Sequence, residues 1–160
     1  EAAVYMAQGL DIPIPASLAD GQPDRPAHAT RRGEAAVAAC TWRTGIDAPG
    51  FRFDNELAEH AVPLDAFRID MAPVSWRAYL AFVNDTGTLP PPYLRAEGGA
   101  WQQRRFGVWQ AVDLDAPAVH VNWHEAQAFC AWAGRRLPTE FEWECAAHTV
   151  PGFAWGEVWE

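Results

Sequence analysis

The chain has 160 residues, of which 49% are hydrophobic and 21% charged, enough for one domain with a hydrophobic core. Its 12 basic residues, all of them Arg, and its 21 acidic residues give a formal net charge of −9, which disfavours binding to nucleic acids and anionic membranes. No apolar run reaches the roughly 18 residues of a membrane-spanning helix. We therefore expect neither a nucleic acid nor a membrane as a partner.

The first 32 residues predict the end of a helix followed by a connection. Residues 1–10 place small and apolar side chains at helical spacing, and Gly9 and Pro13 provide the stop. Residues 11–32 are rich in Pro, Ala and Asp and show no sustained period, which is typical of a linker. We therefore expect a domain to begin near residue 33.

Short strands are predicted in several places after this boundary. The segments 36–43 and 62–70 have β-compatible patterns, and 106–114 predicts a hairpin or a paired strand. Residues 119–121 predict a short strand that leads into a helix. Together with three short helices and long connections, these strands predict an α+β domain rather than a doubly wound sheet.

Each of the three helices has an N-cap signal. Ser75 can cap a helix from Trp76 to about Asn84. Asn122 and Thr139 are each followed three residues later by Glu, which is the capping-box pattern. The side chains expected to face the core are Tyr79, Leu80 and Val83 of the first helix, Trp123, Ala126, Cys130 and Ala133 of the second, and Phe141, Trp143 and Ala146 of the third.

The three cysteines do not form a recognisable framework. Cys40, Cys130 and Cys145 are odd in number and have no C-x-x-C spacing, which argues against structural disulfides and a zinc knuckle. Because no secretion signal opens the chain, this usage predicts a cytoplasmic protein. Cys130 and Cys145 fall on apolar helix faces, so we expect them to be buried, unreactive thiols with a raised pKa.

His120, His124 and Glu125 have the residue types of an iron or zinc site, and His60 is a further imidazole. However, His120 lies in a predicted strand and His124 in the next helix, so the two do not share a helical face. We therefore assign no metal ligand in this chain. Because the sequence also lacks a nucleophile elbow, a Walker loop and a dinucleotide fingerprint, we assign no catalytic residue.

The acidic residues of the third helix, Glu140, Glu142 and Glu144, are spread around it by their spacing of two. We expect Glu142 to cap the start of the helix, and Arg135 and Arg136 are close enough in sequence to pair with the other two. These carboxylates are therefore predicted to be structural.

Several strings in one order resemble the formylglycine-generating-enzyme (sulfatase-modifying factor) domain over residues 34–160. They are FRFDNE at 51–56, FRID at 67–70, PVSWRAYLAFV at 73–83, the segment 117–147 and WGEVWE at 155–160. The most specific part is RLPTE followed by EWE. The resemblance implies an irregular, C-type-lectin-like α+β fold, which we expect to be incomplete in this chain.

The FDNE string is similar to the branch of ergothioneine and selenoneine synthases, in which the domain follows a four-helix DinB-like bundle. This resemblance implies that residues 1–12 end the bundle, 13–33 form the linker and 34–160 form the N-terminal part of the enzyme domain. The iron ligands of that branch, in an H-x-x-x-H-x-E motif, would then lie upstream of Glu1. The segment 92–123 resembles the selenoneine branch more closely.

The resemblance implies an Fe(II)- and O2-dependent enzyme that joins sulfur or selenium to the imidazole C2 of hercynine, an N-trimethylated histidine, from a thiol or selenosugar donor. A formylglycine-generating enzyme and a non-catalytic lectin-like binding module remain as alternatives. Aromatic walls suit a trimethylammonium group through cation–π contact. Tyr93, Trp101 and Trp109 lie in irregular or hairpin segments and are our candidate substrate-binding residues.

Overall fold

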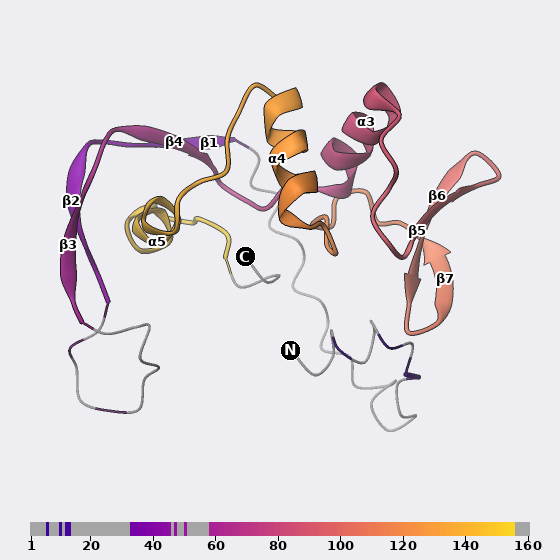
Figure 1. Ribbon diagram of the computed structural model, residues 1–160, viewed down its shortest axis with the longest axis horizontal. Helices are drawn as coiled ribbons and strands as arrows, with labels where there is room; N and C mark the ends of the chain where they lie inside the picture. The colour runs from indigo at the N-terminus through magenta and orange to yellow at the C-terminus, as the bar shows by residue number, and fades with distance from the viewer. Residues whose placement is uncertain are drawn as a thin grey trace. The chain divides into compact units, whose positions relative to one another are not determined.

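The computed structural model describes residues 6, 10, 12–13, 33–45, 47, 50 and 58–155. Apart from single positions, the predicted helix at 1–10, the linker, the FDNE string and the WGEVWE string lie outside the described residues. Within the described part, seven short strands and three helices confirm the α+β class (Figure 1), and none of these helices is long and apolar enough to cross a membrane.

Contacts divide the chain into two units, which we describe separately. Unit 1 comprises Glu1–Thr30 and Val74–Arg135, and unit 2 comprises Arg31–Pro73 and Arg136–Glu160. The strands of unit 2 are β1 (Glu34–Val37), β2 (Cys40–Thr44), β3 (His60–Leu64) and β4 (Phe67–Asp70). Strand β1 pairs with β4 and β2 pairs with β3, in both cases antiparallel.

The two strand pairs of unit 2 form one interrupted ribbon. Val37 faces Phe67, and three positions further along the ribbon Cys40 faces Leu64, so the register is the same on both sides of the break. The β-structure predicted over 36–43 and 62–70 is therefore confirmed, but each segment contributes to two strands rather than one. The break falls at three Ala and one Asp, which are poor strand formers.

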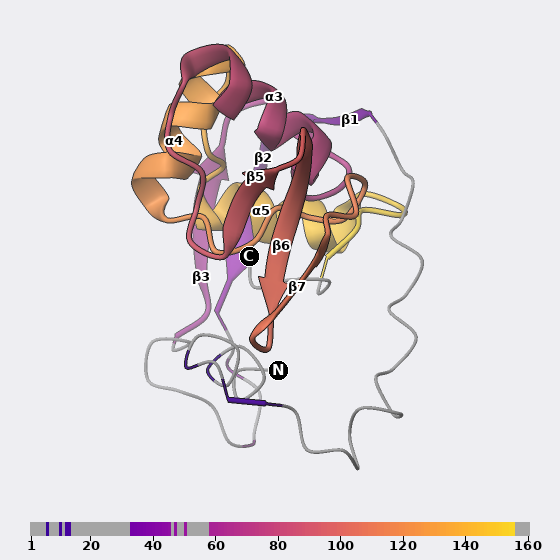
Figure 2. The ribbon, with the colours of Figure 1, turned by 90° about the vertical axis from the view of Figure 1, so that its right-hand side faces the viewer.

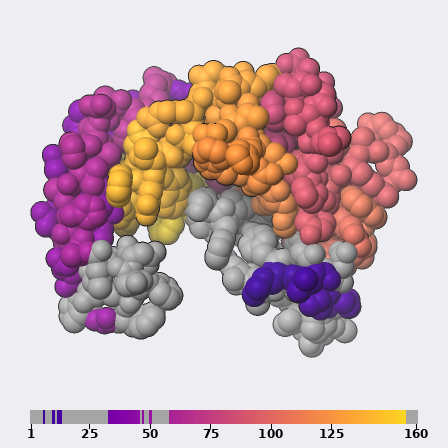
Figure 3. Space-filling view, viewed as in Figure 1, coloured from indigo at the N-terminus to yellow at the C-terminus, as the bar shows by residue number. Residues whose placement is uncertain are grey.

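Helix α5 (Glu140–Thr149) begins at the predicted capping box. Thr139 Oγ1 accepts a hydrogen bond from Glu142 N at 3.2 Å, and Glu142 Oε2 accepts one from Thr139 N at 2.8 Å. The helix buries Cys145 and Ala146 and contacts β2, β3 and β4; its yellow side chains lie beside the violet and magenta strands in Figure 3. The capping box and the burial of Ala146 are thus confirmed.

Two other predicted core residues of α5 are only half-buried. The Phe141 ring meets the His60 ring edge-on at 6.2 Å, and the Trp143 ring meets Phe153 at 6.1 Å. They border the buried stripe of the helix rather than form it.

The Glu142 carboxylate also holds Arg136 in a bidentate ion pair. Arg136 donates from Nη1 to Oε2 at 2.7 Å and from Nη2 to Oε1 at 2.5 Å. These bonds, and the bonds from Thr139, lower the pKa of Glu142 from 4.5 to about 2. Arg136 therefore pairs with the capping residue itself and not, as the sequence predicts, with Glu140 or Glu144, because the bond from Glu142 to Thr139 N holds its carboxylate at the start of the helix.

Because the pKa of Glu142 is lowered, the free energy of unfolding depends on pH in the acid range. Between about pH 4.5 and pH 2 the unfolded state binds a proton at Glu142 that the folded state resists, so the free energy of unfolding should fall as the pH is lowered through this range. Glu142→Gln keeps an acceptor for the cap but has no charge, and should lose this component. Urea unfolding at about pH 5 and pH 3, followed by circular dichroism, measures the difference. Glu140→Gln, at an exposed position, is the control, and an equal acid loss in wild type and Glu142→Gln would contradict the assignment.

Helix α3 (Trp76–Thr86) belongs to unit 1. Ser75 Oγ accepts a hydrogen bond from Ala78 N at 3.4 Å, and at the other end Gly87, with φ 66°, donates from its N to Val83 O. A left-handed residue here favours glycine. The cap is confirmed, and the helix runs two residues further than predicted.

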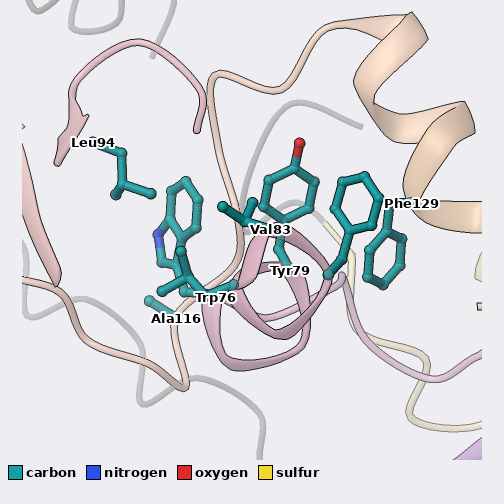
Figure 4. Close-up of a cluster of buried hydrophobic side chains, with 8 residues drawn as sticks. Trp76, Tyr79, Val83, Leu94, Ala116 and Phe129 are labelled. Carbon is teal, nitrogen blue, oxygen red and sulfur yellow. The ribbon is translucent and has the colours of Figure 1, made fainter. Parts of the chain in front are cut away.

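Aromatic rings join α3 to helix α4 (Trp123–Trp132). The Tyr79 and Phe82 rings lie 5.7 Å and 5.9 Å from the ring of Phe129. These rings belong to a hydrophobic core cluster (Figure 4). Its buried members are Trp76, Tyr79, Leu80, Phe82, Val83, Leu94, Ala116 and Phe129. The predicted burial of Tyr79, Leu80 and Val83 is confirmed, whereas the sequence did not single out Trp76, Phe82 or Phe129.

The capping box of α4 is confirmed, but its predicted apolar face is partly wrong. Asn122 Oδ1 accepts from Glu125 N at 3.0 Å, and Glu125 Oε2 accepts from Asn122 N at 2.8 Å. Trp123 is 59% exposed, while Phe129 is buried. At about 100° per residue, Trp123 lies about 120° around the helix from Phe129, which turns it away from the core.

A three-stranded antiparallel sheet completes unit 1. It consists of β5 (Leu94–Glu97), β6 (Ala100–Arg105) and β7 (Val108–Ala111), in the order β5-β6-β7, and lies beside α3 (Figure 2). The predicted hairpin at 106–114 is therefore only the end of a larger sheet. The strand predicted at 119–121 is not formed, because His120 has φ 61°, a left-handed conformation that interrupts an extended chain.

The exposures of two tryptophans predict different costs of truncation. Trp76 is 2% exposed, so Trp76→Ala should lower the free energy of unfolding by about 3–5 kcal/mol. Trp123→Ala, at the exposed start of α4, should change it by less than about 0.5 kcal/mol. Urea unfolding of both variants tests the placement of α3, and similar losses would show that the indole of Trp76 is not a core residue.

Candidate functional site

The candidate substrate-binding residues all lie at the sheet of unit 1, but they do not form one wall. Tyr93 precedes β5, Trp101 is on β6 and Trp109 is on β7. Trp109 faces Arg104 of β6, and Arg104 is three residues from Trp101. Since side chains alternate along a strand and facing residues share a side, the two indoles lie on opposite faces of the sheet.

Trp101 lies on the face that packs against the core. Trp101 is half-buried and packs against the hydrophobic core cluster. It shares this face with Leu94, which is 7% exposed. Trp101 therefore positions the sheet against α3.

Trp109 on the other face already holds a cation of the chain. The guanidinium carbon of Arg95 lies 4.2 Å from the centre of the Trp109 ring, within cation–π range. Arg95 also donates two hydrogen bonds to Gln102 Oε1, at 3.0 and 2.8 Å, and pairs with Glu97 at 2.5 Å. A second cation on the same side of this indole would be repelled by Arg95.

Tyr93 contacts His120, a residue that the sequence predicts to be polar surface or packing and not a metal ligand. The ring centres of Tyr93 and His120 are 5.0 Å apart, and both residues have a positive φ, 69° and 61°. Burial, and to a lesser degree the charge of Arg105, lower the pKa of His120, which favours the neutral imidazole at neutral pH. Strained backbone of this kind collects at functional sites. Only the folded backbone shows it, because most Tyr and His residues have a negative φ, so the residue type does not identify the exceptions.

The described residues do not fit a metal ion. Among them, no three His, Cys, Asp or Glu side chains come close enough together to hold one. His120 contacts Tyr93, His124 lies edge-on to Trp123 at 5.0 Å, and His60 belongs to unit 2. We therefore derive no step through iron at these side chains.

A second polar cluster lies in unit 2, between β2 and α5. Glu144 Oε2 accepts hydrogen bonds from Trp42 Nε1 at 3.0 Å and from Thr44 Oγ1 at 2.6 Å, and the Trp42 ring lies 5.8 Å from that of His148. These contacts fix the helix on the ribbon. Glu144 is thus structural, as predicted, although its partners come from a distant strand.

Comparison with known proteins confirms the resemblance found in the sequence. A family model described as the sulfatase-modifying factor enzyme 1-like domain matches residues 22–159. A hercynine oxygenase of Mycolicibacterium smegmatis is 36% identical over 138 residues, covering 71% of this chain and 32% of the relative. One from Mycolicibacterium thermoresistibile is 34% identical over 130 residues, covering 68% and 29%. A formylglycine-generating enzyme of Bos taurus is 30% identical over 161 residues, covering 81% and 42%. The chain thus spans about a third of the length of the hercynine oxygenases that it matches.

The contact between Arg95 and Trp109 can be measured by a double-mutant cycle. Arg95→Met keeps the apolar stem over the indole and removes the charge, and Trp109→Leu removes the ring. We expect a coupling free energy of about 0.5–1 kcal/mol in urea unfolding. The same cycle with Val108→Ala, on the opposite face, should give a coupling near zero, and equal couplings would contradict the described register.

Proposed function

Because the chain belongs to the sulfatase-modifying factor enzyme 1-like family, we propose that its protein is an Fe(II)- and O2-dependent oxidoreductase that joins sulfur or selenium to the imidazole C2 of hercynine. The observation that carries the proposal is the match to hercynine oxygenases at 34–36% identity, together with the FDNE string at 53–56. The substrates would be hercynine, O2 and a thiol or a selenosugar. The resemblance of 92–123 to the selenoneine branch favours the selenosugar.

We further propose the division of the chain that the resemblance implies. Residues 1–12 would end a DinB-like bundle, 13–33 would be the linker, and 34–160 would be the N-terminal part of a lectin-like enzyme domain in a cytoplasmic protein. Iron would activate oxygen, and its ligands would come from outside this chain.

The part of this chain in the proposed reaction would be to position the substrate. The phenol of Tyr93 lies beside the imidazole of His120, and both are groups of a type that hydrogen-bonds to polar small molecules. A trimethylammonium group would have to meet the indole of Trp109 on the side away from Arg95. Trp101 would act indirectly, by holding the sheet on the core.

The test uses the full-length protein. It is loaded anaerobically with Fe(II), then given O2, hercynine and either a thiol or a selenosugar, and the products are identified by mass spectrometry. We expect an adduct at imidazole C2, and the donor that yields it decides between sulfur and selenium. Iron-replete protein that gives no adduct, but converts cysteine in a sulfatase peptide to formylglycine, would support the alternative suggested by the bovine relative. Inactivity in both assays would favour a binding module.

The same assay tests the substrate contact. Tyr93→Gly tolerates the positive φ but removes the ring, and we expect it to lower kcat/KM for hercynine by about tenfold or more. Val108→Ala, 65% exposed at the start of β7, is the control and should leave kcat/KM unchanged. An unchanged value in Tyr93→Gly would remove Tyr93 from the site.

A further inference from the structure

Two thiols meet within unit 2. Cys40 begins β2 and Cys145 lies in α5, and their Sγ atoms are 3.9 Å apart although 105 positions separate them in the chain. An S–S bond is about 2.05 Å long, so a bond requires the sulfurs to approach by about 2 Å. Side-chain torsions and small backbone shifts provide movements of this size.

The surrounding hydrogen bonds hold the strand against the helix at this point. Glu144, next to Cys145, accepts from Trp42 and Thr44 of β2. One turn later, Thr149 Oγ1 donates to Cys145 O at 2.6 Å. The two sulfurs are therefore brought together by the packing of two regular elements and not by a loop.

The two thiols differ in their access to solvent. Cys40 is exposed, whereas Cys145 is 1% exposed. Burial raises the pKa of the Cys145 thiol, so a reagent in solution reacts with it slowly. A reagent therefore meets Cys40 first, and Cys145 then lies beside whatever bond Cys40 has formed.

We propose that Cys40 and Cys145 form a thiol-modification site that is oxidised to an intramolecular disulfide by low-molecular-weight disulfides. The Cys40 thiolate attacks one sulfur of the reagent RSSR and displaces RS⁻, which leaves a mixed disulfide on Cys40. Cys145 then loses its proton to solvent, attacks Cys40 Sγ and displaces the second RS⁻. Two protein thiols are oxidised to one disulfide, and RSSR is reduced to two RSH, with the two thiol protons.

The product joins β2 covalently to α5 across a long stretch of chain. A cross-link between distant positions restricts the unfolded chain strongly. The oxidised protein should therefore melt several degrees higher than the reduced protein, and a reductant should reverse the shift.

The experiment treats the full-length protein with oxidised glutathione, blocks the remaining thiols by alkylation and analyses tryptic peptides by mass spectrometry. The chain contains no Lys, and cleavage after Arg places the three cysteines in different peptides, 33–43, 106–135 and one that begins at 137. We expect the first and third peptides to be recovered as a disulfide-linked pair. Glutathione on Cys40 in wild type without this pair, or a link from Cys40 to any cysteine other than Cys145, would overturn the proposal.

Two variants separate the steps. Cys145→Ser should retain glutathione on Cys40 at a level about tenfold or more above wild type, because the second step is lost. Cys130→Ser is the matched control and should form the linked pair as wild type does. A wild-type protein that forms the link without a rise in Tm would contradict the described attachment of β2 to α5.

Discussion

Helices α3, α4 and α5 have 11, 10 and 10 residues, and helices of this length are marginal on their own in water. Each therefore depends on side chains that satisfy its first backbone N–H groups and on the surface that it buries. Ser75, Asn122 and Thr139 supply the caps. The connections that enter these helices are consequently as important for the fold as the helices themselves.

The two units attach their helices by different means. In unit 1, aromatic rings of α3 and α4 pack against one another. This packing buries the Tyr79 hydroxyl, which has no hydrogen-bond partner among the described residues, and such burial is energetically unfavourable. Burial also raises the pKa of Tyr79 to about 12. In unit 2, two carboxylates of α5 serve as attachment points. Glu142 joins the cap to Arg136, and Glu144 joins the helix to β2. Two of the acidic residues of the chain thus have a structural role.

Local signals in the sequence predicted the helix starts, because each cap and the backbone N–H that it accepts from lie within four residues of each other. Features set by distant contacts were not predictable in this way. The meeting of Cys40 with Cys145 depends on how α5 lies on the ribbon, and the opposite orientation of Trp101 and Trp109 depends on strand register. The left-handed backbone at Tyr93 and His120 is likewise a property of the folded chain, since a positive φ is uncommon for residues other than glycine. The sequence therefore named candidate residues, whereas their relative geometry could be read only from the folded chain.

This chain matches both relatives named hercynine oxygenase and relatives named formylglycine-generating enzyme. Caps, ion pairs and ring packing build the scaffold, so they do not by themselves distinguish one reaction from another. We look for the residues that distinguish the two reactions among those with an energetically unfavourable backbone conformation, because such strain persists only where the surrounding structure enforces it. Tyr93 and His120 combine a left-handed backbone with a mutual ring contact and with hydrogen-bonding groups. The proposed role of this part of the domain in selecting a substrate therefore depends on these two residues.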